Sequence, residues 1–192
     1  MKFKEFIFLQ KSDLHRYAGN ATSVSFIYNL MLYPGFKYSF WMRTCAYLKS
    51  NIILRYLLFP VAWLVLRHYE YKYGISISYQ THIGSGFYIG HFGGIVVNQN
   101  AIIGKNCNIS HQVTLGKANR GIRKGYPVIG DNVYIGPGAK IIGKVHIGNN
   151  VAIGANCVVT KDIPDNSVVV GIPGRVISSE GSTGYINRTD YK

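Results

Sequence analysis

An aliphatic residue followed by glycine returns along the second half of the chain, from Ile83 onward, at intervals of six residues or multiples of six within each block. From Ile129 to Val159 an aliphatic side chain occupies every sixth position, and a small or branched residue stands four positions after each, as Ala139 does after Ile135. Neither an α-helix, with a period of 3.6, nor an exposed strand, with a period of 2, produces this spacing. The pattern predicts a solenoid of short strands that turn every six residues, with glycine at the corners.

Three such hexapeptides form one triangular coil, and successive coils stack at a strand spacing of about 4.8 Å. The aliphatic and the small residues then point inward and form the core. Cys107 and Cys157 occupy the small inward position, which predicts that both are core residues. With Cys45 they make three widely separated cysteines, which argues against a disulfide framework or a zinc site and fits a reducing compartment.

Two interruptions break the repeat. Ala101 and Ile102 are predicted to be a two-residue insertion, and residues 117–128 a longer one. The longer segment predicts a loop extruded from a corner, either solvated or forming a basic lip over an anion or a neighbouring subunit. Its basic side chains are Lys117, Arg120, Arg123 and Lys124.

Two histidines fall at equivalent places in the repeat. His91 stands two residues after Ile89, and His111 stands two residues after Ile109, three hexapeptides later once the insertion is discounted. We expect them at the same corner of adjacent coils, about one strand spacing apart and beside the Gly93-Gly94 step. A neutral imidazole can accept the proton of a hydroxyl, which the transfer of an acyl group to an alcohol requires.

Residues 1–75 form an arm of different composition, rich in aromatic and aliphatic side chains. Breaks at Tyr33-Pro34-Gly35 and near Pro60 predict two helices. The apolar run from Ile52 to Leu66 is fifteen residues long and contains Arg55 and Pro60, so it is too short and too interrupted to span a membrane. The sequence leaves two interpretations of the arm open: helices lying in a membrane interface, or a hairpin that caps the first coil.

Composition sharpens this picture. The 192 residues suffice for one domain with a short helical arm, and 47% of them are apolar, enough for a sizeable core. The chain has 21 Lys and Arg against 8 Asp and Glu, a net charge of +13, and the arm holds +7 of it. So few carboxylates exclude a carboxylate-rich metal site and an acidic-dyad hydrolase, and the positive charge indicates an anionic partner.

No groove-reading motif for nucleic acid and no secretory signal appear, so we expect a cytoplasmic protein that does not bind nucleic acid.

Four segments carry a resemblance to a known family: residues 33–37, 88–97, 113–116 and 169–177. They resemble the hexapeptide-repeat acyltransferases, and within them the serine acetyltransferase branch. The resemblance implies an all-β solenoid, a left-handed parallel β-helix, that assembles as a homotrimer and uses acetyl-CoA as co-substrate. It covers most of the chain and divides it into the arm (1–75), the β-helix (76–177) and a polar, mobile tail (178–192).

The resemblance also assigns roles to single residues. His91 matches the family's general base, which deprotonates the acceptor hydroxyl for direct attack on the thioester, and His111 is the second catalytic candidate. No metal is required, since thioester, alcohol, base and oriented donors suffice. The residues that match cofactor-binding positions are Thr114, Leu115, Gly116, Gly136, Pro137, Gly154 and Ala155, with Lys161 and Arg175 as partners for the phosphates.

The chain departs from the serine branch at three positions. Gly90 and Ser76 stand where that branch has carboxylates, and Tyr126 stands where it has a histidine in the extruded loop. The carboxylates would hold a zwitterionic amino acid and orient the imidazole. We therefore predict that the acceptor is a sugar hydroxyl of a surface polysaccharide or of its lipid-linked precursor, reached at the cytoplasmic face of the inner membrane through the basic arm.

Two alternatives remain. The first is serine O-acetyltransfer, with Ser76, Tyr126 or His111 standing in for the missing groups and contacting the substrate. The second is a membrane-associated trimeric scaffold without catalytic activity, which would bind no CoA analogue. The sequence alone does not name the acceptor.

Overall fold

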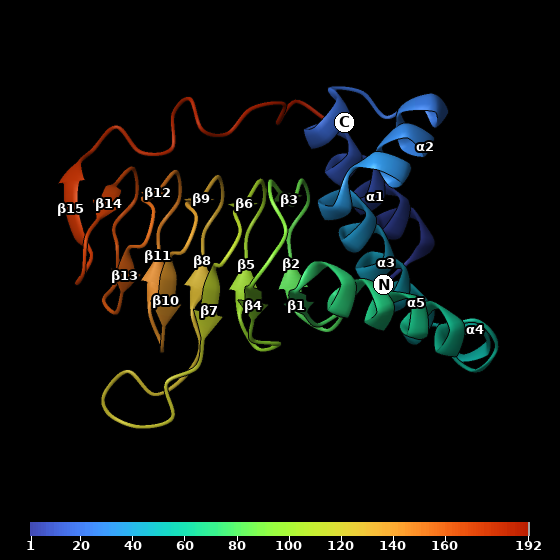
Figure 1. Ribbon diagram of the computed structural model, residues 1–192, viewed down its shortest axis with the longest axis horizontal. Coiled ribbons are helices and arrows are strands. Elements are labelled where there is room, and N and C mark those ends of the chain that lie inside the picture. Colours follow the sequence, from blue (N-terminus) through green and yellow to red (C-terminus); the bar gives the residue numbers. More distant parts are fainter. Residues whose placement is uncertain (192) are drawn as a thin grey trace.

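The computed structural model describes residues 1–191, with a bundle of helices at one end of a prism of stacked strands (Figure 1). The predicted breaks at Tyr33 and Pro60 are present, because Pro34 and Pro60 both stand in the first turn of a helix, where a missing N–H does no harm. The prediction of two helices is nevertheless wrong, since Gly19 and the capping side chain of Asn51 mark further boundaries. The five helices are α1 (Phe3–Ala18), α2 (Ser23–Leu32), α3 (Pro34–Ser50), α4 (Ile52–Leu57) and α5 (Phe59–Tyr73).

The strands form three sheets, one on each side of the prism (Figure 1). The first sheet contains β1 (Ile75–Ile77), β4 (Ile95–Val97), β7 (Thr114–Gly116), β10 (Lys140–Ile142) and β13 (Val158–Val159). The second contains β2 (His82–Ile83), β5 (Ile102–Ile103), β8 (Val128–Ile129) and β11 (His146–Ile147). The third contains β3 (Tyr88–Ile89), β6 (Asn108–Ile109), β9 (Tyr134–Ile135), β12 (Ala152–Ile153), β14 (Val168–Val170) and β15 (Arg175–Ser178).

All neighbouring strands are parallel except β14 and β15. In the regular part of the prism Val128 pairs with His146 and Tyr134 with Ala152, so one coil takes three hexapeptides. The aliphatic residues that end the strands are buried in columns along the axis, as are the cysteines at the small inward position. The predicted fold, a left-handed parallel β-helix with an N-terminal helical arm, is confirmed.

The register places the first interruption of the repeat elsewhere than predicted. Val96 pairs with Thr114, which keeps the regular step of three hexapeptides, whereas Tyr88 pairs with Asn108, a step that is longer by two positions. The two extra residues of the longer coil therefore lie between Tyr88 and Val96. This is the turn that contains His91, so the interruption lies at the candidate base.

The predicted insertion at Ala101 and Ile102 is therefore wrong. Ala101 is 1% exposed and fills the small inward position, and Ile102 is the first residue of β5. The sequence pattern misled because Ile95 lies at a small inward position rather than at the end of a strand. The spacing from Ile95 to Ile103 looks irregular, although the repeat from Val97 to Ile103 is intact.

A column of asparagines holds one edge of the prism, between the second and third sheets. Asn106, Asn132, Asn150 and Asn166 all have φ between 55° and 57°, a left-handed conformation that asparagine tolerates better than most residues. Their side-chain amides bond in series, Asn106 to Asn132 at 2.9 Å, Asn132 to Asn150 at 3.0 Å and Asn150 to Asn166 at 3.0 Å. In these four turns the left-handed position is therefore filled by asparagine instead of glycine.

The helical arm caps the first coil, whose backbone has no preceding strand to pair with. The hydroxyl of Tyr38 accepts a bond from the N–H of Ile77 (3.0 Å) and donates one to its carbonyl (2.8 Å). The hydroxyl of Tyr17 does the same for Ile89, at 2.9 and 3.0 Å. Two tyrosines thus replace the missing strand and satisfy backbone groups that would otherwise be left unpaired. Capping was one of the two interpretations of the arm, and the structure shows it.

A buried ion pair reinforces this contact. Asp13 of α1 binds Arg43 of α3 through both carboxylate oxygens, at 3.0 and 3.1 Å. Arg43 also donates to the carbonyls of Ile83 (2.7 Å) and Gly84 (2.6 Å), and Asp13 accepts from the N–H of Phe87 at 2.8 Å. Within residues 1–191, no helix has the length and apolar character needed to cross a membrane.

The tail runs back along the third sheet to the helices (Figure 1). Its Tyr185 stacks on Tyr134 with ring centroids 4.5 Å apart, and the hydroxyl of Tyr191 donates to Asn106 at 2.6 Å. The tail, which the sequence predicts to be mobile, thus lies against the prism in the part of it that the structure describes. The two tyrosines find partners on the prism that its polar composition does not reveal.

Candidate active site

The two histidines meet at one corner of the prism. His91 follows β3 and His111 follows β6, and the pairing of Ile89 with Ile109 brings their turns together. The imidazole centroids lie 5.8 Å apart, and the ring planes are 78° from parallel. His91 is exposed and His111 is half-buried. This juxtaposition agrees with the spacing expected from the sequence.

The same corner continues along the prism as a column of candidate residues. Strands β3, β6, β9 and β12 are in register, so the residues two positions beyond each strand lie above one another. These residues are His91, His111, Pro137 and Ala155. The candidate base and two of the positions matched to the cofactor therefore line a single edge, between the third and first sheets, along which an extended ligand can lie.

The turns at this edge are tightly fixed. Gly93 and Gly94 have φ of 107° and 66°, and a Cβ on Gly94 would lie 3.2 Å from the side chain of Gln112. The carbonyl of Gly93 accepts from the N–H of Gln112 at 2.7 Å, and the carbonyl of His111 accepts from the N–H of Gly138 at 2.9 Å. The backbone that carries both imidazoles is thus held by its neighbours above and below.

The glycines matched to the cofactor serve the stacking of the coils. A Cβ on Gly136 would lie 2.8 Å from the carbonyl oxygen of Ile153, and the N–H of Gly136 already donates to that oxygen. A Cβ on Gly154 would lie 2.9 Å from the side chain of the next coil. Since these N–H groups are engaged within the solenoid, the surface offered to a ligand here consists of the Pro137 ring and the Ala155 methyl group.

The segment matched to the pantetheine contact lies on the first sheet. Thr114 is half-buried on its outer face, whereas Leu115 is 0% exposed and its carbonyl accepts from the N–H of Asn98 at 2.9 Å. Leu115 is therefore a core residue, and its side chain is not available to contact a ligand on the outer face of the first sheet. A Cβ on Gly116 would lie 2.6 Å from the terminal methyl group of Ile142, which would have to shift to make room for it.

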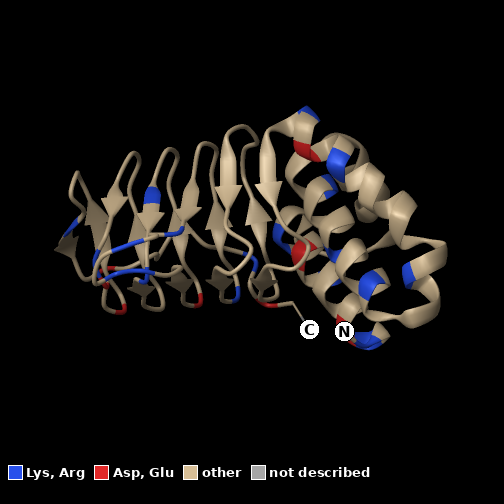
Figure 2. Ribbon diagram, turned by 90° about the horizontal axis from the view of Figure 1, so that it is seen from below, with Lys and Arg blue, Asp and Glu red and all other residues tan. Residues whose placement is uncertain are grey.

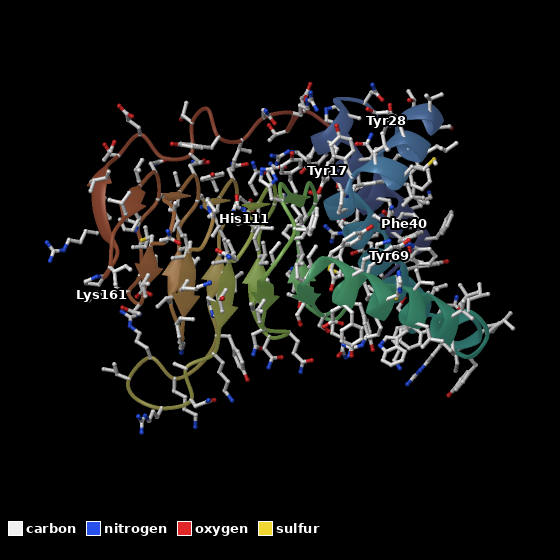
Figure 3. The ribbon with its side chains drawn as sticks, viewed as in Figure 1. Tyr17, Tyr28, Phe40, Tyr69, His111 and Lys161 are labelled. Carbon is white, nitrogen blue, oxygen red and sulfur yellow. The ribbon has the colours of Figure 1, made fainter. Side chains whose placement is uncertain are left out.

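Tyr126 and Lys161 lie at the other edge of the first sheet. The extruded loop leaves the prism between β7 and β8, and Lys161 follows β13 at the same edge (Figures 1 and 3). The ring of Tyr126 is half-buried, 5.6 Å from the ammonium group of Lys117. Within one chain these residues are not brought to the histidine corner, and Ser76 and Thr114 lie on the face between.

The extruded loop is anchored by a surface ion pair. Arg123 donates to both oxygens of Asp162 at 2.7 Å, and its hydrogen bond holds the pKa of Asp162 below the usual value. One of the four basic side chains of the loop is thus engaged in fixing it. Arg175 is exposed at the start of β15, opposite Val170.

Sequence reasoning missed a carboxylate beside Ser76. The Ser76 hydroxyl donates to Oε1 of Glu70 at 3.0 Å, and Oε2 of Glu70 pairs with Arg67 at 2.5 Å. Glu70 comes from the last turn of α5, one coil before the turn of His91, and raises the pKa of the exposed Arg67. A hollow of about 280 Å³ opens beside these three side chains. In the sequence, Glu70 stands three residues after Arg67 and six before Ser76. This Arg-x-x-Glu pair lies in the arm, outside the hexapeptide repeat, so counting repeats does not reveal its contact with Ser76.

Within residues 1–191, no three His, Cys, Asp or Glu side chains gather as the ligands of a metal ion would. The groups at the histidine corner are two imidazoles, backbone carbonyls, small apolar side chains, and the side chains of Phe92 and Gln112. The ammonium group of Lys140 also lies here and donates to the carbonyl of Gln112. This set can accept a proton from a hydroxyl and seat an uncharged chain.

Comparison with known proteins agrees with the repeat. Residues 126–161 match the family described as bacterial transferase hexapeptide (six repeats). A serine acetyltransferase from Synechococcus elongatus is 38% identical over 153 residues, which are 79% of this chain and 60% of the relative. The chain thus spans three fifths of the length of that curated relative.

Solved structures show the same likeness over more of the chain. A soybean serine acetyltransferase apoenzyme has 32% identity and a TM-score of 0.74, covering 91% of this chain and 69% of that one. A serine acetyltransferase in complex with CoA has 26% identity and a TM-score of 0.73, covering 91% of this chain and 71% of that one. The prediction of a polysaccharide acceptor is therefore wrong, since the similar proteins are serine acetyltransferases. That prediction rested on Gly90 and Ser76, which stand where the serine branch has carboxylates; in the structure Ser76 contacts the carboxylate of Glu70.

Proposed function

Because the chain belongs to the hexapeptide-repeat acyltransferase family, we propose that it transfers the acetyl group of acetyl-CoA to the hydroxyl of serine. The observation that carries the proposal is the pairing of His91 and His111 at an edge that continues into Pro137 and Ala155. Base and cofactor surface are thereby adjacent, as direct transfer between two bound substrates requires.

The chemistry assigned to the corner needs one base. The exposed imidazole of His91 accepts the proton of the serine hydroxyl while the oxygen attacks the thioester carbon. The carbon–sulfur bond then breaks, and the CoA sulfur leaves with the proton that the imidazole returns to it. We assign His111 to holding the acceptor oxygen or the ring of His91 in place, because it is the more buried of the two and its carbonyl accepts from the N–H of Gly138.

Serine also carries an ammonium and a carboxylate group, which need partners of opposite charge. Glu70 accepts from Ser76 on the outer face of the first sheet, and it lies in an open hollow with Arg67 and Ser76. We assign Glu70 to the ammonium group. Two other acidic side chains have different partners: Asp13 is buried with Arg43, and Asp162 anchors the extruded loop.

The division of the candidate residues between two edges of the first sheet supports a homotrimer. Tyr126 and Lys161 lie at one edge and the histidine corner at the other, so a neighbouring copy is needed to bring the two sets together (Figure 3). In this arrangement Thr114, Pro137 and Ala155 contact the uncharged arm of CoA. Lys161 and Arg175, both exposed, contact its phosphates.

The test is an acetyl-transfer assay on the full chain that follows release of the CoA thiol. We expect release with L-serine and acetyl-CoA and none with L-alanine, which lacks the hydroxyl. Titration calorimetry with CoA tests the cofactor surface separately, and an Ala155→Trp variant should weaken CoA binding. Binding of CoA without transfer to serine would overturn the acceptor assignment. Absence of CoA binding would overturn the enzymatic proposal and favour the scaffold.

A further inference from the structure

The tip of the helical arm exposes an unusual number of large apolar side chains. We define the apolar tip as the outward side chains of α4 and of the first half of α5, which are 47–76% exposed. Its members are Ile52, Ile53, Tyr56, Leu57, Leu58, Val61 and Leu64. Scattered apolar residues are normal on a surface, but a contiguous set of this size marks an interaction site.

The apolar side chains of the tip are additional to those with which α5 packs into the core of the arm. Ala62 and Leu66 of the same helix are each 4% exposed and pack into the arm, so the core-facing side of α5 is already occupied. By contrast, the outward face of α1 carries exposed charges, among them Lys4 and Lys11. The outward side chains of α4 are instead apolar apart from Arg55.

Charge identifies the kind of partner. From residue 14 to residue 69 the chain has six basic residues and no acidic one (Figure 2). Arg16 and Arg43 are buried and Arg67 pairs with Glu70, so the cations of this surface are Lys37, Lys49 and Arg55. Arg55 lies on the tip itself, where no carboxylate within residues 1–191 pairs with it, and Lys49 flanks it over the ring of Phe59. Tyr56 adds an amphipathic ring of the sort found at the level of lipid head groups.

A second set of exposed apolar side chains lies on α2, which like α4 is at the end of the molecule away from the solenoid (Figure 1). Val24, Ile27 and Met31 of α2 are 58–79% exposed. Between α1, α2 and α3 a hollow of about 500 Å³ is lined largely by apolar side chains, Phe26 and Phe40 among them. Figure 3 shows Tyr28 and Phe40 at this same end.

We propose that the apolar tip lies in the head-group region of an anionic lipid bilayer, without crossing it. The aliphatic side chains enter the acyl boundary, and Arg55 and Lys49 contact lipid phosphates. A second copy of this chain is the less suitable occupant, because a symmetric contact would bring one cationic tip against another with no carboxylate to offset the charge. The tip lies apart from the histidine corner, so this inference does not depend on the proposed reaction.

The experiment is flotation of the full-length protein with vesicles of phosphatidylcholine alone and with about one third phosphatidylglycerol. The wild-type protein should float with the anionic vesicles. The double variant Ile53→Glu, Leu57→Glu should bind at least about tenfold more weakly, since it replaces two inserted side chains by charges. The matched control is Ile122→Glu, an equally apolar, fully exposed side chain in the extruded loop, which should leave flotation unchanged.

Arg55→Gln separates the electrostatic part, because one basic residue near an anionic surface is worth about a fivefold change in partition. It should weaken binding to anionic vesicles only. Folding of each variant is checked by its melting temperature and by CoA binding. Wild-type protein that does not float overturns the proposal, and so does a double variant that floats normally. If the wild-type protein did not bind vesicles and the double variant formed a smaller oligomer than the wild type, the tip would be a contact between copies of this chain.

Discussion

Glu70 of helix α5 accepts a hydrogen bond of 3.0 Å from Ser76 of the first strand, across the junction between the arm and the prism. The two residues are six positions apart, separated by the end of the helix at Tyr73 and by Gly74, whose φ of 60° reverses the chain. The turn therefore folds an acidic side chain of the arm onto the outer face of the first sheet. Arg67 holds the other carboxylate oxygen.

We expect Glu70→Gln to weaken the use of serine. The substitution keeps the shape of the side chain but removes the charge that would face the ammonium group, and a charged hydrogen bond contributes about 1.5–3 kcal/mol. The KM for serine should rise roughly tenfold to a hundredfold, while the KM for acetyl-CoA stays constant. Steady-state kinetics with each substrate varied in turn provides the measurement, with the exposed Glu180→Gln as control. An unchanged KM for serine would remove Glu70 from the site.

The prism was predictable because its sequence repeats the same physical requirement in every coil. Each strand must end in an aliphatic side chain of similar size that points into the prism. Ile135 and Ile153, which pair in neighbouring coils and are both buried, meet this requirement. The proximity of His91 and His111 was predicted by counting residues alone. A local period therefore predicted contacts between residues that lie a whole coil apart in the chain.

The arm and its junction were not predictable in the same way. Contacts such as Tyr38 with Ile77, or Arg43 with Asp13, depend on how non-repeating helices pack, and no period encodes them. The error at Ala101 arose for a related reason. The spacing shows that two residues are extra, but only the pairing of the strands shows which turn contains them.

His91 and His111 should differ in their effect on the reaction. Loss of a general base lowers kcat by about a hundredfold to ten-thousandfold. We expect that loss for His91→Ala, whose ring is exposed to the ligand, and a smaller loss for His111→Ala. CoA binding should be retained in both variants, because neither imidazole is assigned to the cofactor. If His111→Ala caused the larger loss of kcat at equal CoA affinity, the roles of the two histidines would have to be exchanged.

The contact of Arg43 with Asp13 should be essential for joining the arm to the prism. Burial raises the pKa of Asp13, and the charge of Arg43 opposes this change. Arg43→Met leaves a carboxyl group buried without its partner, which costs about 3–5 kcal/mol. Thermal denaturation should show a melting temperature lower by roughly 6–20 °C. Arg55→Gln, at an exposed position, serves as control, and equal melting of both variants would contradict the prediction.

The three cysteines should resist thiol reagents in the folded protein. Burial raises the pKa of Cys45 and of Cys107 to about 12 and also raises that of Cys157. Since the thiolate is the reactive form, little of it exists at pH 8, and the side chains are covered. Mass spectrometry should find no rapid alkylation until denaturant is added, when all three react. Ile122→Cys, on the exposed loop, should be labelled at once, whereas rapid labelling of Cys107 would show that the prism opens.

The tail should contribute to stability through its contacts with the prism. The N–H of Ser182 donates to the carbonyl of Asn150 at 3.0 Å, and its hydroxyl donates to the carbonyl of Asn132 at 2.7 Å. Each such bond contributes about 1 kcal/mol, and the stacked pair of Tyr185 and Tyr134 a similar amount. A chain truncated after Ser178 should therefore unfold at a temperature lower by several degrees, and the Ser182 amide of the full chain should exchange hydrogen slowly. Rapid exchange at Ser182 together with unchanged melting of the truncated chain would show that these contacts do not hold the tail in solution.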